Sequence, residues 1–169
     1  MLDLKQYTDE QIVRLITEEF IRDTDLIDSG ICPVCFNQKH NQILYGNAEE
    51  MLLYEDDDYQ CLYVDKPRSN GHIMIVSKKH FKDMSELDDE TCEKIFLFAK
   101  KAMNCIKEVY ECESVYLCTM CDGPMNHFHI QLIPRYKNEV YGSKNFTKVR
   151  RPYKEDRIKK EQMRKLLQK

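Results

Sequence analysis

The sequence predicts an α+β fold, with several strands before and after one long central helix and further helices at both ends of the chain. Three observations carry this prediction. Short runs of β-forming residues lie before and after a single long amphipathic segment, and both ends of the chain show helical periodicity. No linker is long enough to separate two domains, and 169 residues is an ordinary length for one domain.

Capping signals and apolar periodicity place the helices. Thr8 to Gln11 has the Ser/Thr-x-x-Glu/Gln pattern of a capping box, and apolar residues follow it at helical spacing. Pro152 separates the last helix from the segment before it, because proline ends or interrupts a helix. The expected helices cover about 8–22, from Ser85 or Asp88 to about 110, and about 154–168.

Six short runs rich in β-forming residues stand between turn signals. The expected strands are Gln42–Tyr45, Met51–Tyr54, Gln60–Val64, Gly71–Val76, Ser114–Met120 and His127–Arg135. Before them, the segment from Asp28 to Cys35 is rich in turn-forming residues, and we expect it to form a knuckle.

The composition excludes several classes of protein. Hydrophobic residues make up 42% and charged residues 33%, with 5 Gly and 5 Pro, which excludes collagen and low-complexity chains. The longest apolar run, Ile73–Val76, is far too short to span a membrane. The N-terminus lacks the apolar region of a signal peptide, so we expect a cytoplasmic protein. In that reducing compartment the 8 cysteines are expected to bind metal or to be buried, rather than to form disulfides.

The net charge of −3 conceals an asymmetry between an acidic body and a basic tail. Residues 1–143 carry 15 basic and 26 acidic side chains, whereas residues 144–169 carry 11 basic and 3 acidic ones. Such a tail can form a solvated helix, bind a phosphate-rich partner, or fold back on the body. Arg150 and Arg151 are candidates to reach a phosphorylated substrate.

The strongest chemical signal is His127-Phe128-His129-Ile130-Gln131. Side chains alternate along a strand, so the two histidines and Gln131 share one face, while Phe128 and Ile130 pack on the core. A neutral imidazole can attack phosphorus, and an amide can donate to a phosphate oxygen. Attack requires the second ring nitrogen to donate to a carbonyl, which fixes the tautomer. The plain alternative is a pair of partly exposed histidines on an edge strand.

A second signal, Cys32-x-x-Cys35, is half of a tetrahedral zinc site, because zinc takes four Cys or His ligands in such sites. The pair can also be buried thiols or a redox pair, although a redox pair is expected in a βαβ unit and here a helix precedes it. Cys118-x-x-Cys121 has the same spacing but begins inside an expected strand. His40, four residues after Cys35, is a candidate third ligand.

Together these motifs resemble the histidine triad (HIT) superfamily of nucleotide hydrolases and transferases. The family joins a Gly-His strand ending in Lys-x-His, here Gly71 to His80, to a long helix. A His-x-His-x-His strand follows, often before Pro-Arg, here His127 to Arg135. The resemblance covers about residues 30–137. It implies an α+β fold with a HIT-like antiparallel sheet of about five strands and one long central helix. It also implies a single HIT-like domain over 1–169, with a helical N-terminal extension over 1–29 and a basic C-terminal extension over 138–169.

The chain departs from the family pattern at two places. Gln131 replaces the third His, which resembles the branch of galactose-1-phosphate uridylyltransferase and the dinucleoside tetraphosphate phosphorylases. Those enzymes pass the nucleotidyl group to a phosphate rather than to water. The Gly-Gln phosphate loop is replaced by Gly123-Pro124-Met125-Asn126, so that only Asn126 is carried over as a substrate-binding residue.

The resemblance also implies roles for individual residues. His129 is the nucleophile that attacks the α-phosphorus to form a nucleotidyl-histidine, with His127 beside it in the catalytic group and Gln131 holding a phosphoryl oxygen. Asp65 accepts hydrogen bonds from the ribose hydroxyls, and His72 lies near the base or supports its strand. Mg²⁺ can accompany the phosphates of the substrate, although no acidic cluster requires it.

Zinc-bearing members of the superfamily use a C-x-x-C pair, the His that ends the Gly-His strand, and the first His of the triad. The matching residues here are Cys32, Cys35, His80 and His127. The resemblance therefore implies a structural zinc ion beside the nucleophile.

The expected partner is a small nucleotide substrate such as a dinucleoside polyphosphate, a nucleotide sugar or a phosphoramidate, and no membrane. Family members are often homodimers, so we expect a homodimer. The alternative function is a zinc-knuckle module that holds nucleic acid with the basic tail. That alternative is less favoured, because the body is acidic and few aromatic residues interleave with the tail.

Overall fold

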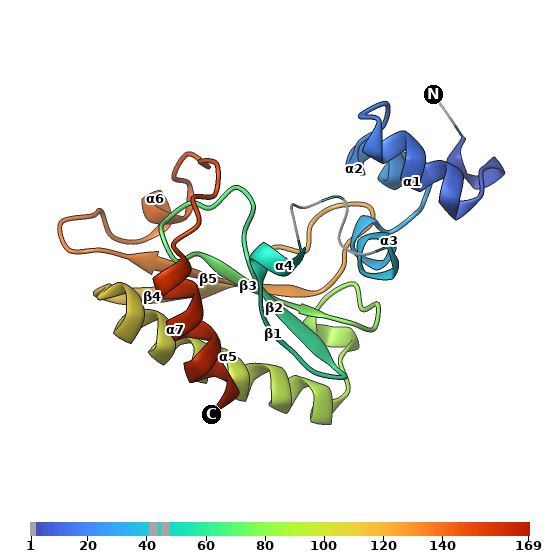
Figure 1. The fold of residues 1–169 in the computed structure, drawn as a ribbon. Helices are drawn as coiled ribbons and strands as arrows, with labels where there is room; N and C mark the ends of the chain where they lie inside the picture. Colours follow the sequence, from blue (N-terminus) through green and yellow to red (C-terminus); the bar gives the residue numbers. More distant parts are fainter. Residues whose placement is uncertain (1–2, 41–43, 45–47) are drawn as a thin grey trace.

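The computed structural model describes residues 3–40, 44 and 48–169 of the chain and has the α+β architecture expected from the sequence (Figure 1). Its sheet has five strands in the order β1-β2-β3-β5-β4, and all neighbouring strands are antiparallel. The expected strand over 42–45 lies outside the described residues, apart from Leu44. The strands are β1 (Leu52–Glu55), β2 (Tyr59–Tyr63), β3 (Ile73–Ser77), β4 (Ser114–Cys118) and β5 (His129–Arg135).

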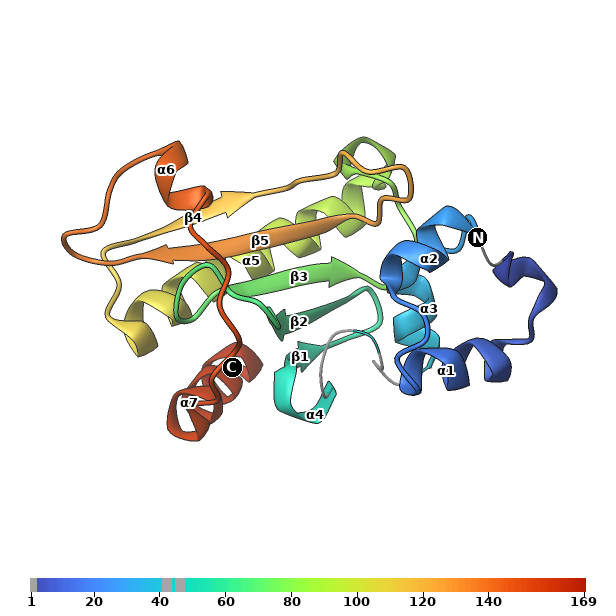
Figure 2. The ribbon, with the colours of Figure 1, turned by 90° about the horizontal axis from the view of Figure 1, so that it is seen from above.

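The long helix α5 (Asp89–Tyr110) covers one face of the sheet, as Figure 2 shows from above. It begins at Asp88, whose carboxylate accepts a hydrogen bond from the Thr91 backbone at 2.8 Å. Helix α7 (Arg157–Gln168) packs beside α5 and strand β1. Fully buried aliphatic side chains from the sheet and both helices form the main core: Ile73, Ile75, Ile130, Leu132, Ile95, Ala102, Ile106, Met163 and Leu167.

The N-terminal helices form a second, smaller core away from the sheet. It contains Leu4, Ile12, Ile21, Leu26 and Phe36. The helices around this core are the 3₁₀ turn η1 (Leu4–Gln6), α1 (Asp9–Thr17), α2 (Asp23–Asp28) and α3 (Pro33–Lys39). Three further short elements lie elsewhere in the chain: α4 (Ala48–Met51), the 3₁₀ turn η2 (Met84–Glu86) and α6 (Ser143–Phe146).

Two expectations for this N-terminal part are corrected. The capping box at Thr8 forms, but the helix ends at Thr17 rather than near residue 22. Glu19 takes the left-handed conformation with φ of 58°, which ends the helix and leaves Phe20 71% exposed instead of on the apolar stripe. The expected knuckle is helical in part, because Pro33 suits the first turn of α3 and the Cys32 sulfur caps it.

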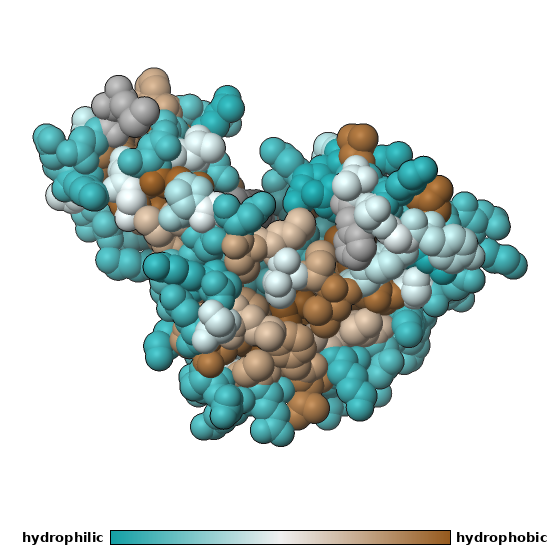
Figure 3. Space-filling model, turned by 180° about the vertical axis from the view of Figure 1, so that it is seen from behind, coloured by the Kyte–Doolittle hydropathy of each residue, from teal (hydrophilic) through white to brown (hydrophobic). Residues whose placement is uncertain are grey.

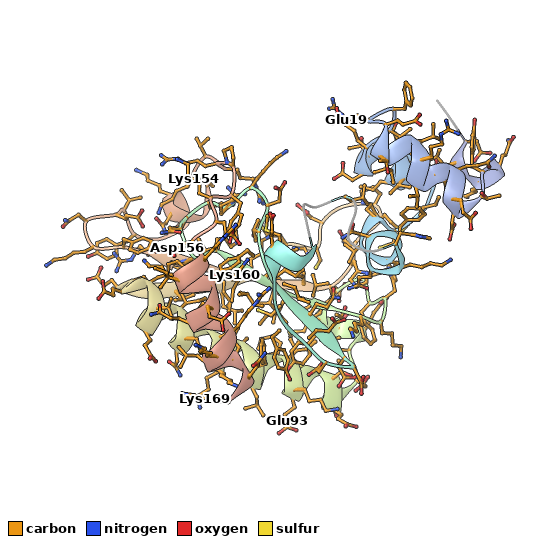
Figure 4. All side chains as sticks on the ribbon, viewed as in Figure 1. Glu19, Glu93, Lys154, Asp156, Lys160 and Lys169 are labelled. Carbon is orange, nitrogen blue, oxygen red and sulfur yellow. The ribbon has the colours of Figure 1, made fainter. Side chains whose placement is uncertain are left out.

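The basic C-terminal segment folds back on the body, which was one of the three outcomes open to it. The Arg151 backbone donates to the Pro67 carbonyl at 3.0 Å, and the Tyr153 backbone donates to the Asp65 carbonyl at 2.9 Å. This segment and the N-terminal helices stand on opposite sides of the molecule, as Lys154 and Glu19 show in Figure 4. Among the described residues, no helix is long and apolar enough to cross a membrane.

Candidate active site and metal site

A cleft of about 820 Å³ lies between the N-terminal helices, the open face of the sheet and the C-terminal segment. Viewed from behind, the surface is hollowed between these two ends of the chain (Figure 3). Strand register brings two expected site residues onto the face that lines the cleft, because His129 lies opposite Val76 and Gln131 opposite Met74. Asp65, which follows β2, lines the same cleft.

Hydrogen bonds define the tautomer of His129. Its Nδ1 lies 2.9 Å from the carbonyl oxygen of His127, which can only accept, so Nδ1 carries the proton and donates it. In this tautomer the opposite ring nitrogen, Nε2, carries the lone pair. The Gln131 amide nitrogen lies 3.3 Å from this Nε2. The result is an imidazole whose Nε2 atom lies beside an amide group.

Gln131 is 6% exposed, and its amide oxygen has no hydrogen-bond partner within the described structure. His72, which directly precedes β3, is only 1% exposed and accepts a hydrogen bond from the Arg68 backbone at Nδ1. Burial, and secondly the cation of Arg150, lower the pKa of His72 to about 3. His72 is therefore neutral at physiological pH, and it lies outside the residues that line the cleft.

Next to the nucleophile, four side chains meet in a metal-binding arrangement. Cys32 and Cys35 from the start of α3 face His80 and His127, and all four ligand atoms lie within 4.8 Å of one another. The Cys35 sulfur is 3.3 Å from Nδ1 of His80 and 3.3 Å from Nδ1 of His127. A tetrahedral zinc site has sulfur–nitrogen edges of about 3.5 Å, since Zn–S is about 2.3 Å and Zn–N about 2.0–2.1 Å. The cluster fits such an ion.

The protonation chemistry of the cluster also suits a cation. Burial and the neighbouring Cys32 sulfur raise the pKa of Cys35 to about 12, so two thiolates in this place need a positive charge to be stable. Burial lowers the pKa of His127 to about 4, which keeps the ring neutral. Its Nε2 lies 2.7 Å from the Ser77 carbonyl and donates to it, leaving the Nδ1 lone pair directed at the cysteines.

Comparison with known proteins identifies the family. The HIT domain pattern matches residues 45–138, which is more than half of the 169-residue chain. The chain belongs to the HIT family. An uncharacterized HIT-like protein of Borreliella burgdorferi is 28% identical over 114 residues, covering 64% of this chain and 82% of the relative.

Two further HIT relatives carry names that state an activity. An adenosine 5'-monophosphoramidase of Schizosaccharomyces pombe is 32% identical, covering 45% of this chain and 56% of that protein. An adenylylsulfatase of Arabidopsis thaliana is 27% identical, covering 58% of this chain and 52% of that protein. Among solved structures, a zinc-bound histidine triad family protein of Mycobacterium smegmatis shares the fold, with a TM-score of 0.55, 16% identity, and coverage of 69% of this chain and 83% of that one.

The HIT fold brings some of the expected site residues together and leaves others apart. His80 completes the metal cluster, whereas His40 lies elsewhere, with its Nε2 3.1 Å from the Asp9 carboxylate. Asn126 closes its own loop by accepting a hydrogen bond from the Gly123 backbone at 2.8 Å, and it does not line the cleft. Both ring nitrogens of His127 are engaged within this site, so its contact with the nucleophile is through its backbone carbonyl.

Sequence reasoning missed two contributors to the HIT site. The Ser77 carbonyl orients His127, and nothing in the local sequence around Ser77 indicates this role. The end of α1 and the segment between α1 and α2 supply one wall of the cleft through Ile16, Glu19 and Ile21. The apolar spacing of that segment indicates a helix but carries no information about what the helix faces.

Proposed function

We propose that this protein is a nucleotide-processing enzyme that cleaves a nucleoside 5'-phosphate derivative through a covalent nucleotidyl-histidine on His129. One observation carries the proposal: the Nδ1 proton of His129 is held by a carbonyl, and its Nε2 lone pair faces the cleft beside Gln131. The two relatives named as an adenylylsulfatase and an adenosine 5'-monophosphoramidase support a substrate of this class.

The proposed chemistry has two displacement steps. In the first, Nε2 of His129 forms a bond to the α-phosphorus, and the bond from phosphorus to the leaving group breaks with its electron pair on the leaving group. The proton on Nδ1 stays with the imidazole, and the His127 carbonyl stabilises the positive charge that develops on the ring. The Gln131 amide donates to a non-bridging phosphoryl oxygen. In the second step an acceptor attacks the same phosphorus and releases His129.

Gln131 favours phosphate as the acceptor in the second step. Attack by water requires a base to remove a proton, and a carboxamide is not a base at neutral pH. Inorganic phosphate already carries an anionic oxygen and needs no deprotonation. The His-x-His-x-Gln pattern, which resembles that of the nucleotidyltransferase branch of the family, supports this choice of acceptor.

We further propose that the cluster of Cys32, Cys35, His80 and His127 holds a structural zinc ion. Its donor set of two sulfurs and two imidazoles is typical of closed structural zinc sites. The bound ion would join α3 to the beginning of the catalytic strand. Because His127 also supplies the carbonyl that orients His129, the metal site and the nucleophile share one residue. The two imidazoles that lie within 4.8 Å of the cysteine sulfurs complete a metal donor set, which a thiol–disulfide redox pair does not require.

A substrate screen tests the proposed activity. The metal-replete protein is incubated with a dinucleoside polyphosphate, a nucleotide sugar and adenosine phosphoramidate, each with and without inorganic phosphate. Chromatography then identifies the nucleotide products. At least one substrate is expected to give a nucleoside diphosphate only when phosphate is present. A nucleoside monophosphate formed at the same rate with and without phosphate would contradict the role given to Gln131, and no turnover of any of the three would contradict the activity.

We propose a homodimer in which the two subunits contact each other through β4, a strand at the edge of the sheet. Strand β4 stands at the edge of the sheet, and the exposed apolar residues near it include Leu117, at 37% exposure, and Met120, at 39%. Figure 3 shows apolar side chains gathered on the rear face of the molecule. Leu117→Asp is expected to convert a dimer into a monomer in light scattering. Leu97→Asp, on a 58% exposed side chain of α5, is the control for added charge. A monomeric parent protein would exclude the dimer.

A further inference from the structure

Among the described residues of the C-terminal segment, Arg150 lines the cleft that contains His129. Its backbone runs along residues 65–68, held by Arg151 N to Pro67 O and by Tyr153 N to Asp65 O, at 3.0 and 2.9 Å. In an extended segment, neighbouring side chains point to opposite sides. Arg150 accordingly lines the cleft that contains His129 and Gln131, while Arg151 lines a separate hollow on the other side.

The guanidinium of Arg150, on an exposed side chain, has a backbone carbonyl as its hydrogen-bond partner. Its Nη1 donates to the Lys66 carbonyl at 3.0 Å, which directs the group at the part of the cleft formed by Asp65 and Lys66. Burial and then the cation of Arg68 lower the pKa of Arg150. Arginine remains charged at neutral pH even so.

The surroundings of Arg150 contain a second cation, Arg68. Arg68 donates from Nη1 to the Lys148 carbonyl at 2.9 Å, which holds the tail against the body. Arg68 lines the same separate hollow as Arg151, so within the cleft of His129 it acts on Arg150 only through its charge. Two nearby cations repel each other, and an anion bound by Arg150 relieves that repulsion.

We propose that Arg150 binds a second phosphate group of the substrate, distinct from the α-phosphate that His129 attacks. The inference rests on the proposed function and narrows its substrate class to nucleotides with at least two phosphate groups. The second phosphate either belongs to the leaving group or is carried by the ribose, because Arg150 lies near both Gln131 and the Asp65 end of the cleft. In both cases the planar guanidinium group of Arg150 donates hydrogen bonds to the oxygens of a phosphate group.

Equilibrium binding tests this inference without relying on turnover. Calorimetry measures the affinities of AMP, ADP and adenosine 3',5'-bisphosphate for the parent protein, for Arg150→Gln and for Arg151→Gln. The Arg151 variant loses the same charge one residue away and is the matched control. Arg150→Gln is expected to weaken one of the two doubly phosphorylated ligands roughly 10- to 100-fold relative to AMP, as loss of a charge-assisted hydrogen bond predicts. Arg151→Gln is expected to change all three affinities by less than about threefold, because its side chain lies outside the cleft.

The pattern of losses identifies the place of the phosphate. Selective weakening of ADP assigns it to the leaving group, and selective weakening of the 3',5'-bisphosphate assigns it to the ribose. Equal weakening of all three ligands, or no weakening, would overturn the role of Arg150 while leaving the proposed function intact. A parent protein that binds none of the three would instead overturn the proposed function, and the inference with it.

Discussion

Replacing His129 with Ala is expected to lower nucleotide turnover by at least about 10⁴-fold, the scale of loss when a covalent nucleophile is removed. The reason is geometric. Among the described residues, His129 lines the cleft with Nδ1 donating to a carbonyl and with its Nε2 lone pair beside Gln131. Its neighbour His127 has both ring nitrogens engaged, and His72 is buried outside the cleft.

The measurement combines steady-state kinetics with rapid-quench mass spectrometry. The parent protein is expected to accumulate a nucleotidyl adduct on the peptide that contains His129, and His129→Ala is expected to show none. His40→Ala is a matched control, since His40 pairs with Asp9 away from the cleft and its removal leaves the catalytic groups in place. Turnover within tenfold of the parent rate in His129→Ala, or an adduct on another residue, would refute the nucleophile assignment.

Replacing Cys32 with Ser is expected to remove the bound metal and to destabilise the fold strongly. The expected metal content falls from about one zinc ion per chain to near zero. Structural zinc sites contribute on the order of 10 kcal/mol of binding free energy that is coupled to folding. Their loss is therefore expected to lower the melting temperature by more than about 10 °C. Chelation of the parent protein is expected to reproduce the effect.

The control for this substitution is Cys92→Ser, because Cys92 is a half-buried free thiol on α5 outside the metal cluster. Elemental analysis and thermal unfolding are measured on both variants. A further variant, His80→Ala, is expected to lose metal while His40→Ala keeps it. A Cys32→Ser protein that retains one metal ion per chain would disprove the ligand set. Activity is expected to fall together with metal content, since His127 both faces the cluster and orients His129.

Much of the secondary structure followed from short-range patterns, and the errors arose where short-range signals compete. The central helix begins at its Asp88 cap, one of the two starts expected, because a side-chain cap and an apolar stripe are local properties. The helix predicted over about 8–22 is longer than the observed α1, because the apolar spacing continues past Glu19, where the backbone takes the left-handed conformation. The short helix α3 was expected to be a turn, because its cysteines and proline resemble turn residues when read without their tertiary contacts.

The sequence by itself determined which groups are available for chemistry. Alternation along a strand depends only on neighbouring residues, so the shared face of His129 and Gln131 could be stated before any fold was known. Tertiary structure alone decided how those groups are used. The Cys32 sulfur contacts the His127 ring although the two residues are 95 positions apart in the sequence. His80 rather than His40 joins the metal cluster because of where β3 ends relative to α3. Arg150 reaches the cleft because the C-terminal segment pairs with residues 65–67. These are contacts between distant segments, and their geometry is set by the packing of the sheet and helices as a whole.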